Sequence, residues 1–144
     1  MAKLLSDNNM PACQILIIDD DEDDISLLSE TLVSCGVEEV HYVFSAMEAF
    51  MYLQSIQAKT DLPKLIITDH YLPMIKGTEF MEDLKKMNSY KDIHVIVLSN
   101  VGPTQVEKYQ QLGVKEVVPK PNTYDEYVAL AKKITEKILP ERNQ

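Results

Sequence analysis

A short apolar run that leads directly into six consecutive acidic residues constrains the fold of this chain more than any other feature. The run covers residues 15–18, and the acids cover residues 19–24. Because most of the run is β-branched and it is too short for a helix, it predicts a buried strand. Ligands of open parallel sheets bind beyond the carboxyl ends of the strands. The acids therefore fall where a binding site is expected.

Three later segments repeat this arrangement, in which a strand-like apolar run ends at a polar residue. The runs that begin near residues 65, 95 and 117 lead to Asp69, Ser99 and Lys120. If the strands are parallel neighbours, their carboxyl ends meet at one edge of a sheet. We therefore expect that edge to gather the carboxylates of Asp19, Asp20 and Asp69 with one hydroxyl and one amine.

Segments with helical spacing of apolar residues alternate with these strands. The alternation predicts right-handed βαβ crossovers and a parallel sheet covered by helices on both faces. We expect one α/β domain over residues 13–140, a flexible segment at 1–12, and a tail at 141–144 with no output domain. The expected strands are residues 14–19, 40–44, 64–69, 94–99 and 115–119, each followed by a helix.

Capping residues mark several of the expected helix ends. Asp21 or Asp23 can cap the start of the first helix, and Thr78 can cap the third. Gly36 and Gly113 are suited to end the first and fourth helices.

Charge and composition exclude several classes of function. The formal net charge is −9, whereas nucleic acids and anionic membranes demand a basic patch, so we expect neither as a partner. The two cysteines, Cys13 and Cys35, lack metal-ligand spacing, and we expect reduced thiols in a cytoplasmic protein. No apolar run approaches the length of a membrane span.

The expected cluster of side chains suits phosphoryl chemistry. Three neighbouring carboxylates raise one another's pKa unless a cation lies among them. Hard oxygen ligands without His or Cys favour Mg²⁺ over zinc. Lys120 and Ser99 could neutralise and hydrogen-bond a phosphoryl group, and an Asp carboxylate is a competent nucleophile toward phosphorus. The sequence therefore predicts an aspartyl-phosphate site.

The order and spacing of these motifs resemble the receiver domain of two-component response regulators over residues 13–138. The resemblance implies a flavodoxin-like sheet of five parallel strands in the order 2-1-3-4-5. It also implies Mg²⁺ as the cofactor. The residues that carry it are the acidic pair Asp19 and Asp20, then Asp69, Leu72-Pro73 with Gly77, Ser99, and Lys120-Pro121.

The same resemblance implies a role for each site residue. Asp69 would be the phosphoacceptor, and the acidic pair would bind Mg²⁺ with Asp69 and the backbone carbonyl of Tyr71. Ser99 would hydrogen-bond the phosphoryl group, and Lys120 would form an ion pair with it. The bond between Lys120 and Pro121 is often cis in this family.

The resemblance also implies partners. A histidine kinase or a histidine phosphotransfer protein would donate the phosphoryl group, and the receiver would catalyse its own phosphorylation and dephosphorylation. With no output domain, the readout would be binding to a downstream protein. A homodimer could form through the face made by the fourth helix, the strand at 115–119 and the last helix.

Four positions depart from the usual pattern of the family. Val117 replaces the usual aromatic switch residue, so signalling by rotation of an aromatic ring is in question. Asn100 replaces the usual small residue after the hydroxyl. Tyr71 and Val101 occupy the two positions that influence phosphate lifetime, and we expect this bulky, poorly polar pair to slow hydrolysis.

The same residues admit three alternative functions. Asp19, Asp21, Asp23 and Glu30 match positions of an EF-hand calcium loop, but Asp24 lies where the loop needs Gly. A pseudo-receiver would be a phosphorylation-independent binding module, which Val117 and Asn100 favour mildly. A phosphatase of the haloacid-dehalogenase type would use Asp19 as nucleophile, but residue 23 does not match its motif.

Two expectations concern residues beside the predicted site. The acids at 21–24 are expected to cap the helix and to lie on the surface rather than to bind a ligand. His70 is expected to point away from the site or to line the loop.

Overall fold

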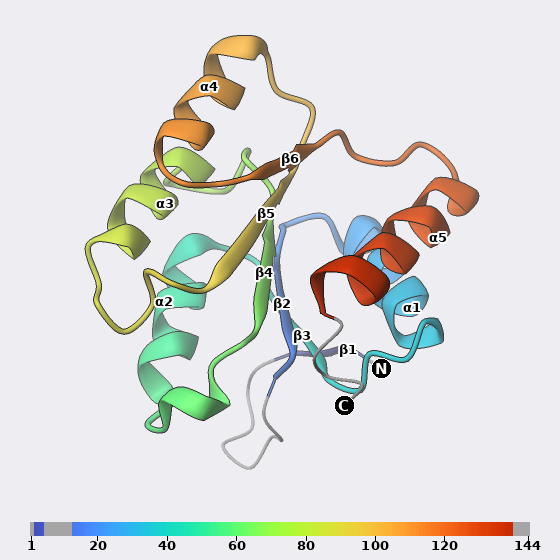
Figure 1. Cartoon of the computed structure of the whole chain (residues 1–144), viewed down its shortest axis with the longest axis horizontal. Coiled ribbons are helices and arrows are strands. Elements are labelled where there is room, and N and C mark those ends of the chain that lie inside the picture. The colour runs from blue at the N-terminus through green and yellow to red at the C-terminus, as the bar shows by residue number, and fades with distance from the viewer. Residues whose placement is uncertain (1, 5–12, 140–144) are drawn as a thin grey trace.

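Apolar, β-branched runs form the strands, and crossover helices set the order of these strands in the sheet (Figure 1). The computed structural model describes residues 2–4 and 13–139. Within these ranges, six strands form one sheet in the order β1-β3-β2-β4-β5-β6. They are β1 (Ala2–Leu4), β2 (Ile15–Ile18), β3 (Val40–Val43), β4 (Leu65–Thr68), β5 (His94–Leu98) and β6 (Glu116–Val118).

This topology confirms the predicted flavodoxin-like fold. The five strands expected from the sequence lie in the order β3-β2-β4-β5-β6, which is the predicted 2-1-3-4-5. Each of these strands runs parallel to its neighbours. Parallel neighbours need a crossover connection, and a helix supplies it here.

Strand β1 was not predicted. The sequence indicated a flexible segment at residues 1–12, whereas Ala2–Leu4 pairs in parallel with residues 40–42 of β3. The rest of that segment, residues 1 and 5–12, lies outside the described residues, as does the predicted tail at 141–144. Without β1, strand β3 would present a row of unpaired backbone groups at the sheet edge, which the added strand satisfies.

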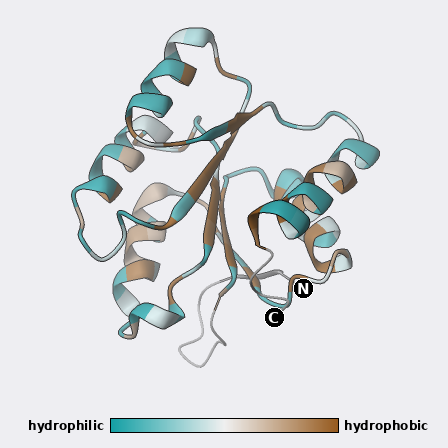
Figure 2. Cartoon of the chain, in the orientation of Figure 1, coloured by the Kyte–Doolittle hydropathy of each residue, from teal (hydrophilic) through white to brown (hydrophobic). Residues whose placement is uncertain are grey.

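Helices cover both faces of the sheet. Figure 1 shows α1 and α5 on one face and α2, α3 and α4 on the other. The strands are hydrophobic in Figure 2, whereas the helices carry hydrophilic residues as well. The helices are α1 (Glu22–Ser34), α2 (Ala46–Ser55), α3 (Gly77–Lys85), α4 (Pro103–Gln111) and α5 (Tyr124–Lys133), with a 3₁₀ turn at η1 (Lys59–Asp61) and a π-helical turn at η2 (Ile134–Ile138).

The two helical layers explain why β2 is apolar at every position. Leu16 and Ile18 belong to the core under α2, α3 and α4, whereas Ile15 and Ile17 belong to the core under α1 and α5. Successive side chains of a strand point to opposite faces. A strand that is buried on both faces therefore cannot alternate between apolar and polar residues.

Helix α3 begins earlier than predicted. Its first residue is Gly77, so the expected cap, Thr78, lies inside the first turn and is buried. The carboxylate of Glu79 accepts a hydrogen bond from the N–H of Lys76 at 3.1 Å. Glu79 thus satisfies the backbone donor at the start of the helix.

The other predicted caps are confirmed. Asp21 precedes α1, and its carboxylate accepts hydrogen bonds from the N–H groups of Asp23 and Asp24 at 2.9 and 3.2 Å. Gly36 and Gly113 follow α1 and α4 with φ angles of 103° and 88°. These angles lie in the left-handed region that glycine adopts at little cost.

The two cysteines are free thiols, and we expect them to differ in reactivity. Cys13 is buried and donates a hydrogen bond to the carbonyl of Ile15 at 2.9 Å, whereas Cys35 is half-buried. Burial raises the pKa of the Cys13 thiol to about 12. In native protein at pH 8, iodoacetamide should therefore alkylate Cys35 well before Cys13, as peptide mass spectrometry would show.

The shift at Cys13 also predicts a dependence of stability on pH. Between an unfolded pKa of 9.0 and a folded pKa of about 12, the folded chain keeps a proton that the unfolded chain loses. This thiol therefore contributes about 1.4 kcal/mol less to stability for each pH unit above 9. Urea unfolding at pH 8 and pH 10 should show a steeper loss for wild type than for Cys13→Ala. Equal losses of stability in the two proteins would contradict the raised pKa of the Cys13 thiol.

None of the helices within residues 13–139 is long and apolar enough to cross a lipid bilayer.

Candidate functional site

The parallel sheet brings the predicted site residues to its carboxyl edge. Asp19 directly follows β2, Asp69 follows β4, and Ser99 follows β5. Lys120 lies two residues after the end of β6. Asp19, Asp69 and Ser99 are buried, and Lys120 is half-buried. The four side chains thus lie in a partly desolvated site in which charge interactions are stronger than in water.

Three carboxylates form an acidic cluster at this edge. Oxygens of Asp19, Asp20 and Asp69 lie within 4.8 Å of one another. Asp19 and Asp69 are 5% and 7% exposed, whereas Asp20 is open to solvent. Burial raises the pKa of Asp19, although hydrogen bonds from the Asp21 N–H and from Lys120 oppose this effect. Three hard oxygen donors at this spacing are compatible with Mg²⁺ or a similar ion.

The ammonium of Lys120 lies among these carboxylates. Its Nζ is 2.9 Å from Asp19 Oδ2 and 3.2 Å from Asp69 Oδ2. Burial tends to lower the pKa of Lys120, but hydrogen bonds to Asp24 and Asp19 and the charge of Asp69 raise it above its ordinary value overall. Lys120 therefore remains protonated and partly neutralises the acidic cluster.

Asp24 is part of the site, contrary to the expectation that it lies on the surface. Its Oδ2 is 2.6 Å from Lys120 Nζ, which is the shortest of the three Lys120 ion pairs. Its Oδ1 accepts a hydrogen bond from the hydroxyl of Tyr127 on α5 at 3.2 Å. Sequence spacing carries no signal for this placement, because the contact joins the first turn of α1 to a residue 96 positions further along the chain.

The loop after β4 holds the Asp69 carboxylate. The N–H of Tyr71 donates a hydrogen bond to Asp69 Oδ1 at 3.3 Å. The Tyr71 ring is 54% exposed, and Lys76 Nζ lies 5.8 Å from its centroid. Asp69 thus has one oxygen bound to a backbone donor and the other close to Lys120. The expected slow hydrolysis due to Tyr71 and Val101 stays a prediction.

Ser99 and Lys120 are set in place by the ends of β5 and β6. The N–H of Ser99 donates to the carbonyl of Val118 at 2.8 Å. The Ser99 hydroxyl makes no hydrogen bond to another residue of the described chain, so it can donate to a ligand. The bond between Lys120 and Pro121 is trans, unlike the cis bond often found in the family that the sequence resembles. Trans is the ordinary preference of an X–Pro bond.

His70 contacts α4 rather than the acidic cluster. Its Nδ1 is 2.6 Å from the hydroxyl of Tyr109, which is fully buried. Burial lowers the pKa of His70 and raises the pKa of Tyr109. The hydrogen bond links the residue after Asp69 to a helix 39 residues further along the chain. Sequence spacing carries no signal for this contact.

Comparison with known families accounts for this geometry. The sequence model of the response regulator receiver domain matches residues 15–132. The chain belongs to this family. Receiver domains are signalling phosphoacceptors of two-component systems, and they interact with histidine kinases or phosphotransfer proteins. They bind a divalent metal, and the acidic cluster that this requires is present.

Several relatives share most of the matched region. Chemotaxis protein CheY1 of Helicobacter pylori is 26% identical over 111 residues, which cover 76% of this chain and 86% of the relative. Response regulator Rre1 of Synechocystis is 27% identical over 122 residues, which cover 83% of this chain but half of the relative.

Solved structures of response regulators share the fold. The crystal structure of the phosphorylated cyanobacterial phytochrome response regulator RcpA matches with a TM-score of 0.75 and 28% identity, over 87% of this chain and 93% of that one. The Mn²⁺-bound response regulator Rcp1 matches with a TM-score of 0.74 and 24% identity, over the same shares of the two chains.

Proposed function

We propose that this receiver accepts a phosphoryl group on Asp69 from the phosphohistidine of a histidine kinase or phosphotransfer protein. The observation that carries the proposal is the Lys120 ammonium, which lies 2.9 Å from Asp19 and 3.2 Å from Asp69 beside the acidic cluster. A cation at this point can balance the charge that a phosphoryl group brings to Asp69.

Asp69 supplies the nucleophile. One of its carboxylate oxygens forms a bond to phosphorus, while the P–N bond of the phosphohistidine breaks and its electron pair stays on the imidazole. Lys120 pairs with the charge of the phosphoryl oxygens, and the free hydroxyl of Ser99 donates a hydrogen bond to one of them. The backbone N–H of Tyr71 holds the carboxylate at 3.3 Å during the transfer.

Asp19, Asp20 and Asp69, with the backbone carbonyl of Tyr71, would hold Mg²⁺. All four groups are hard oxygen donors, and the three carboxylates already converge within 4.8 Å, which fits this ion. When bound, Mg²⁺ neutralises carboxylate and phosphoryl charge.

The readout that we propose is binding to another protein in the cytoplasm, through the face made by α4, β6 and α5. Only Tyr109 of α4 is fully buried, and an element with few buried contacts can shift at low cost. The same face is where we would expect a homodimer. The net charge of −9 makes nucleic acid an unsuitable partner.

Acetyl phosphate provides a test of the phosphoacceptor function. An Asp69 oxygen displaces acetate from phosphorus, and acetate leaves with the electron pair of the broken P–O bond. We expect intact-mass spectrometry to show a base-labile gain of one phosphoryl group that needs Mg²⁺ and is lost in Asp69→Asn. Asp92→Asn, an exposed aspartate elsewhere, is the matched control and should keep the gain.

Two other outcomes would reject the proposal. No gain in wild type, together with no binding of beryllofluoride, would favour a pseudo-receiver that acts as a binding module. A gain that survives in Asp69→Asn would assign the nucleophile to another residue.

A further inference from the structure

Asp24 lies closer to the Lys120 ammonium than Asp19 or Asp69 does. The Asp24 Oδ2 to Lys120 Nζ distance is 2.6 Å, against 2.9 Å to Asp19 and 3.2 Å to Asp69. The other oxygen of Asp24 accepts the hydroxyl of Tyr127, whose side chain is buried on α5. Asp24 is thus fixed at both oxygens and is directed at the Lys120 ammonium.

The Lys120 ammonium is shared among three carboxylates: it donates a hydrogen bond to Asp24 and lies within ion-pair distance of Asp19 and Asp69. An ammonium has three N–H groups, and here three carboxylates lie within ion-pair distance of it. A phosphoryl group on Asp69 brings new oxygens that need the same donors. Lys120 can serve them fully only if another contact loosens.

Of the three ion pairs of Lys120, the one with Asp24 can break at the lowest cost to the site. Asp24 does not belong to the cluster formed by Asp19, Asp20 and Asp69. It is also the most exposed of the three carboxylates around Lys120, at 27% against 7% and 8% for Asp19 and Asp69. Water can therefore solvate the Asp24 carboxylate once Lys120 has turned away.

We propose that Asp24 is a positioning residue that competes with the phosphoryl group for Lys120 and so restrains phosphorylation of Asp69. This inference rests on the proposed phosphoacceptor function. The negative charge of Asp24 lowers the positive potential that Lys120 presents to an incoming phosphoryl donor. Removal of that charge, with the shape of the side chain kept, leaves Lys120 free to pair with phosphoryl oxygens.

The test compares the rate of phosphoryl uptake from acetyl phosphate in three proteins. We expect Asp24→Asn to take up phosphoryl groups about three- to fivefold faster than wild type, which is the upper part of the range for a partly exposed ion pair. Asp23→Asn is the matched control. It removes the same charge from the same turn of α1, but Asp23 is exposed and its carboxylate has no contact with Lys120. Its rate should stay within about twofold of wild type.

Rescue separates a competing charge from a structural role. Asp24→Glu restores a carboxylate and should bring the rate back toward that of wild type. If Asp24→Asn does not fold, Asp24→Ala carries the same expectation. An unchanged or slower rate in a folded, uncharged variant, with wild type labelled normally, would overturn the proposal for Asp24 alone. Failure to label wild type would instead overturn the phosphoacceptor function.

Discussion

Replacement of Lys120 by methionine is expected to slow phosphoryl uptake from acetyl phosphate by about 10²- to 10³-fold, as is typical when one charge-stabilising donor is removed from a site. Methionine keeps much of the volume of the side chain but removes the ammonium that lies 3.2 Å from Asp69 Oδ2. The rate of mass gain, with Mg²⁺ and acetyl phosphate held constant, measures the effect.

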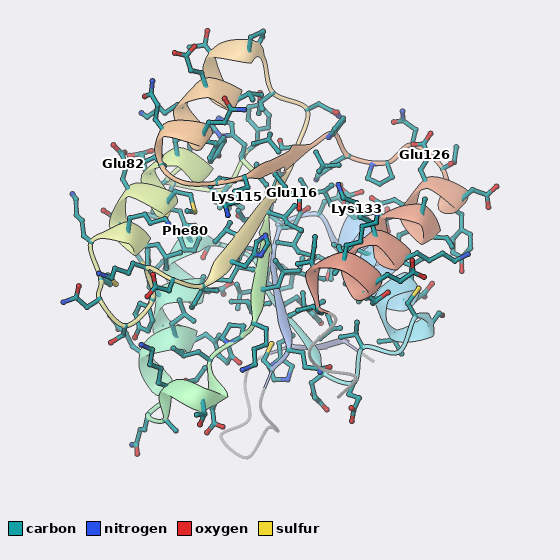
Figure 3. The ribbon with its side chains drawn as sticks, viewed as in Figure 1. Phe80, Glu82, Lys115, Glu116, Glu126 and Lys133 are labelled. Carbon is teal, nitrogen blue, oxygen red and sulfur yellow. The ribbon has the colours of Figure 1, made fainter. Side chains whose placement is uncertain are left out.

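A second lysine of the chain offers a matched control for this variant. Lys133 on α5 forms an ion pair with Glu116 on β6 at 2.8 Å, and both side chains are labelled in Figure 3. Lys133→Met removes the same charge from the protein and should leave the rate of uptake within about twofold of wild type, because surface ion pairs contribute little. A Lys120→Met rate close to that of Lys133→Met would contradict the role of Lys120.

The same variant should also change how stability depends on pH. Without Lys120, Asp19 loses the hydrogen bond and the charge that oppose the effect of burial, so the folded pKa of Asp19 rises further. Groups with raised folded pKa values bind protons more readily in the folded chain, so the variant gains stability relative to wild type as pH falls. Urea unfolding at pH 7 and pH 5.5 measures the free energy of unfolding of both proteins. The value for Lys120→Met, relative to wild type, should be higher at pH 5.5 than at pH 7.

Replacement of Gly77 by alanine should destabilise the fold by about 1–3 kcal/mol, the usual cost of an overpacked core position. A Cβ at Gly77 would collide with the hydroxyl of Tyr109, and it would lie 3.1 Å from both the Asp69 carbonyl oxygen and the Cα of His70. Two of these three neighbours are backbone atoms of the phosphoacceptor loop, which cannot rotate away. Urea unfolding measures the loss.

Controls for the Gly77 prediction come from the same chain. A Cβ at Gly102 would meet no other atom within 4 Å, so Gly102→Ala should cost less than about 1 kcal/mol, which reflects only the weaker capping by alanine at the start of α4. Addition of Tyr109→Phe to Gly77→Ala should recover only part of the loss, because the backbone contacts remain. Equal stabilities of Gly77→Ala and Gly102→Ala would contradict the close packing of the loop after β4 against α4.

Much of the site could be predicted because the residues that build it follow the strands directly. Asp19, Asp69 and Ser99 each come immediately after a buried strand, and a parallel sheet places such positions at one edge. Lys120 could be added because it lies only two residues after the end of β6. The two faces of the sheet could likewise be predicted, because apolar runs without alternation occur where helices cover both sides.

Contacts between distant elements could not be predicted from the sequence. The hydrogen bond of His70 to Tyr109 and the ion pair of Asp24 to Lys120 join residues 39 and 96 positions apart. Both depend on how α1 and α4 pack against the sheet rather than on local pattern. The three residues of β1 are too few to show periodicity, and their pairing with β3 is visible only when the sheet is assembled.

The identity of the residue that becomes phosphorylated is the most direct test of the phosphoacceptor function. Borohydride reduces an aspartyl phosphate to homoserine, so treatment after acetyl phosphate, followed by proteolysis and peptide sequencing by mass spectrometry, locates the modified residue. We predict homoserine at position 69, where the carboxylate lies between the Tyr71 N–H and the Lys120 ammonium. Homoserine at position 19, with position 69 unmodified, would contradict this assignment and would favour the chemistry of a haloacid-dehalogenase phosphatase.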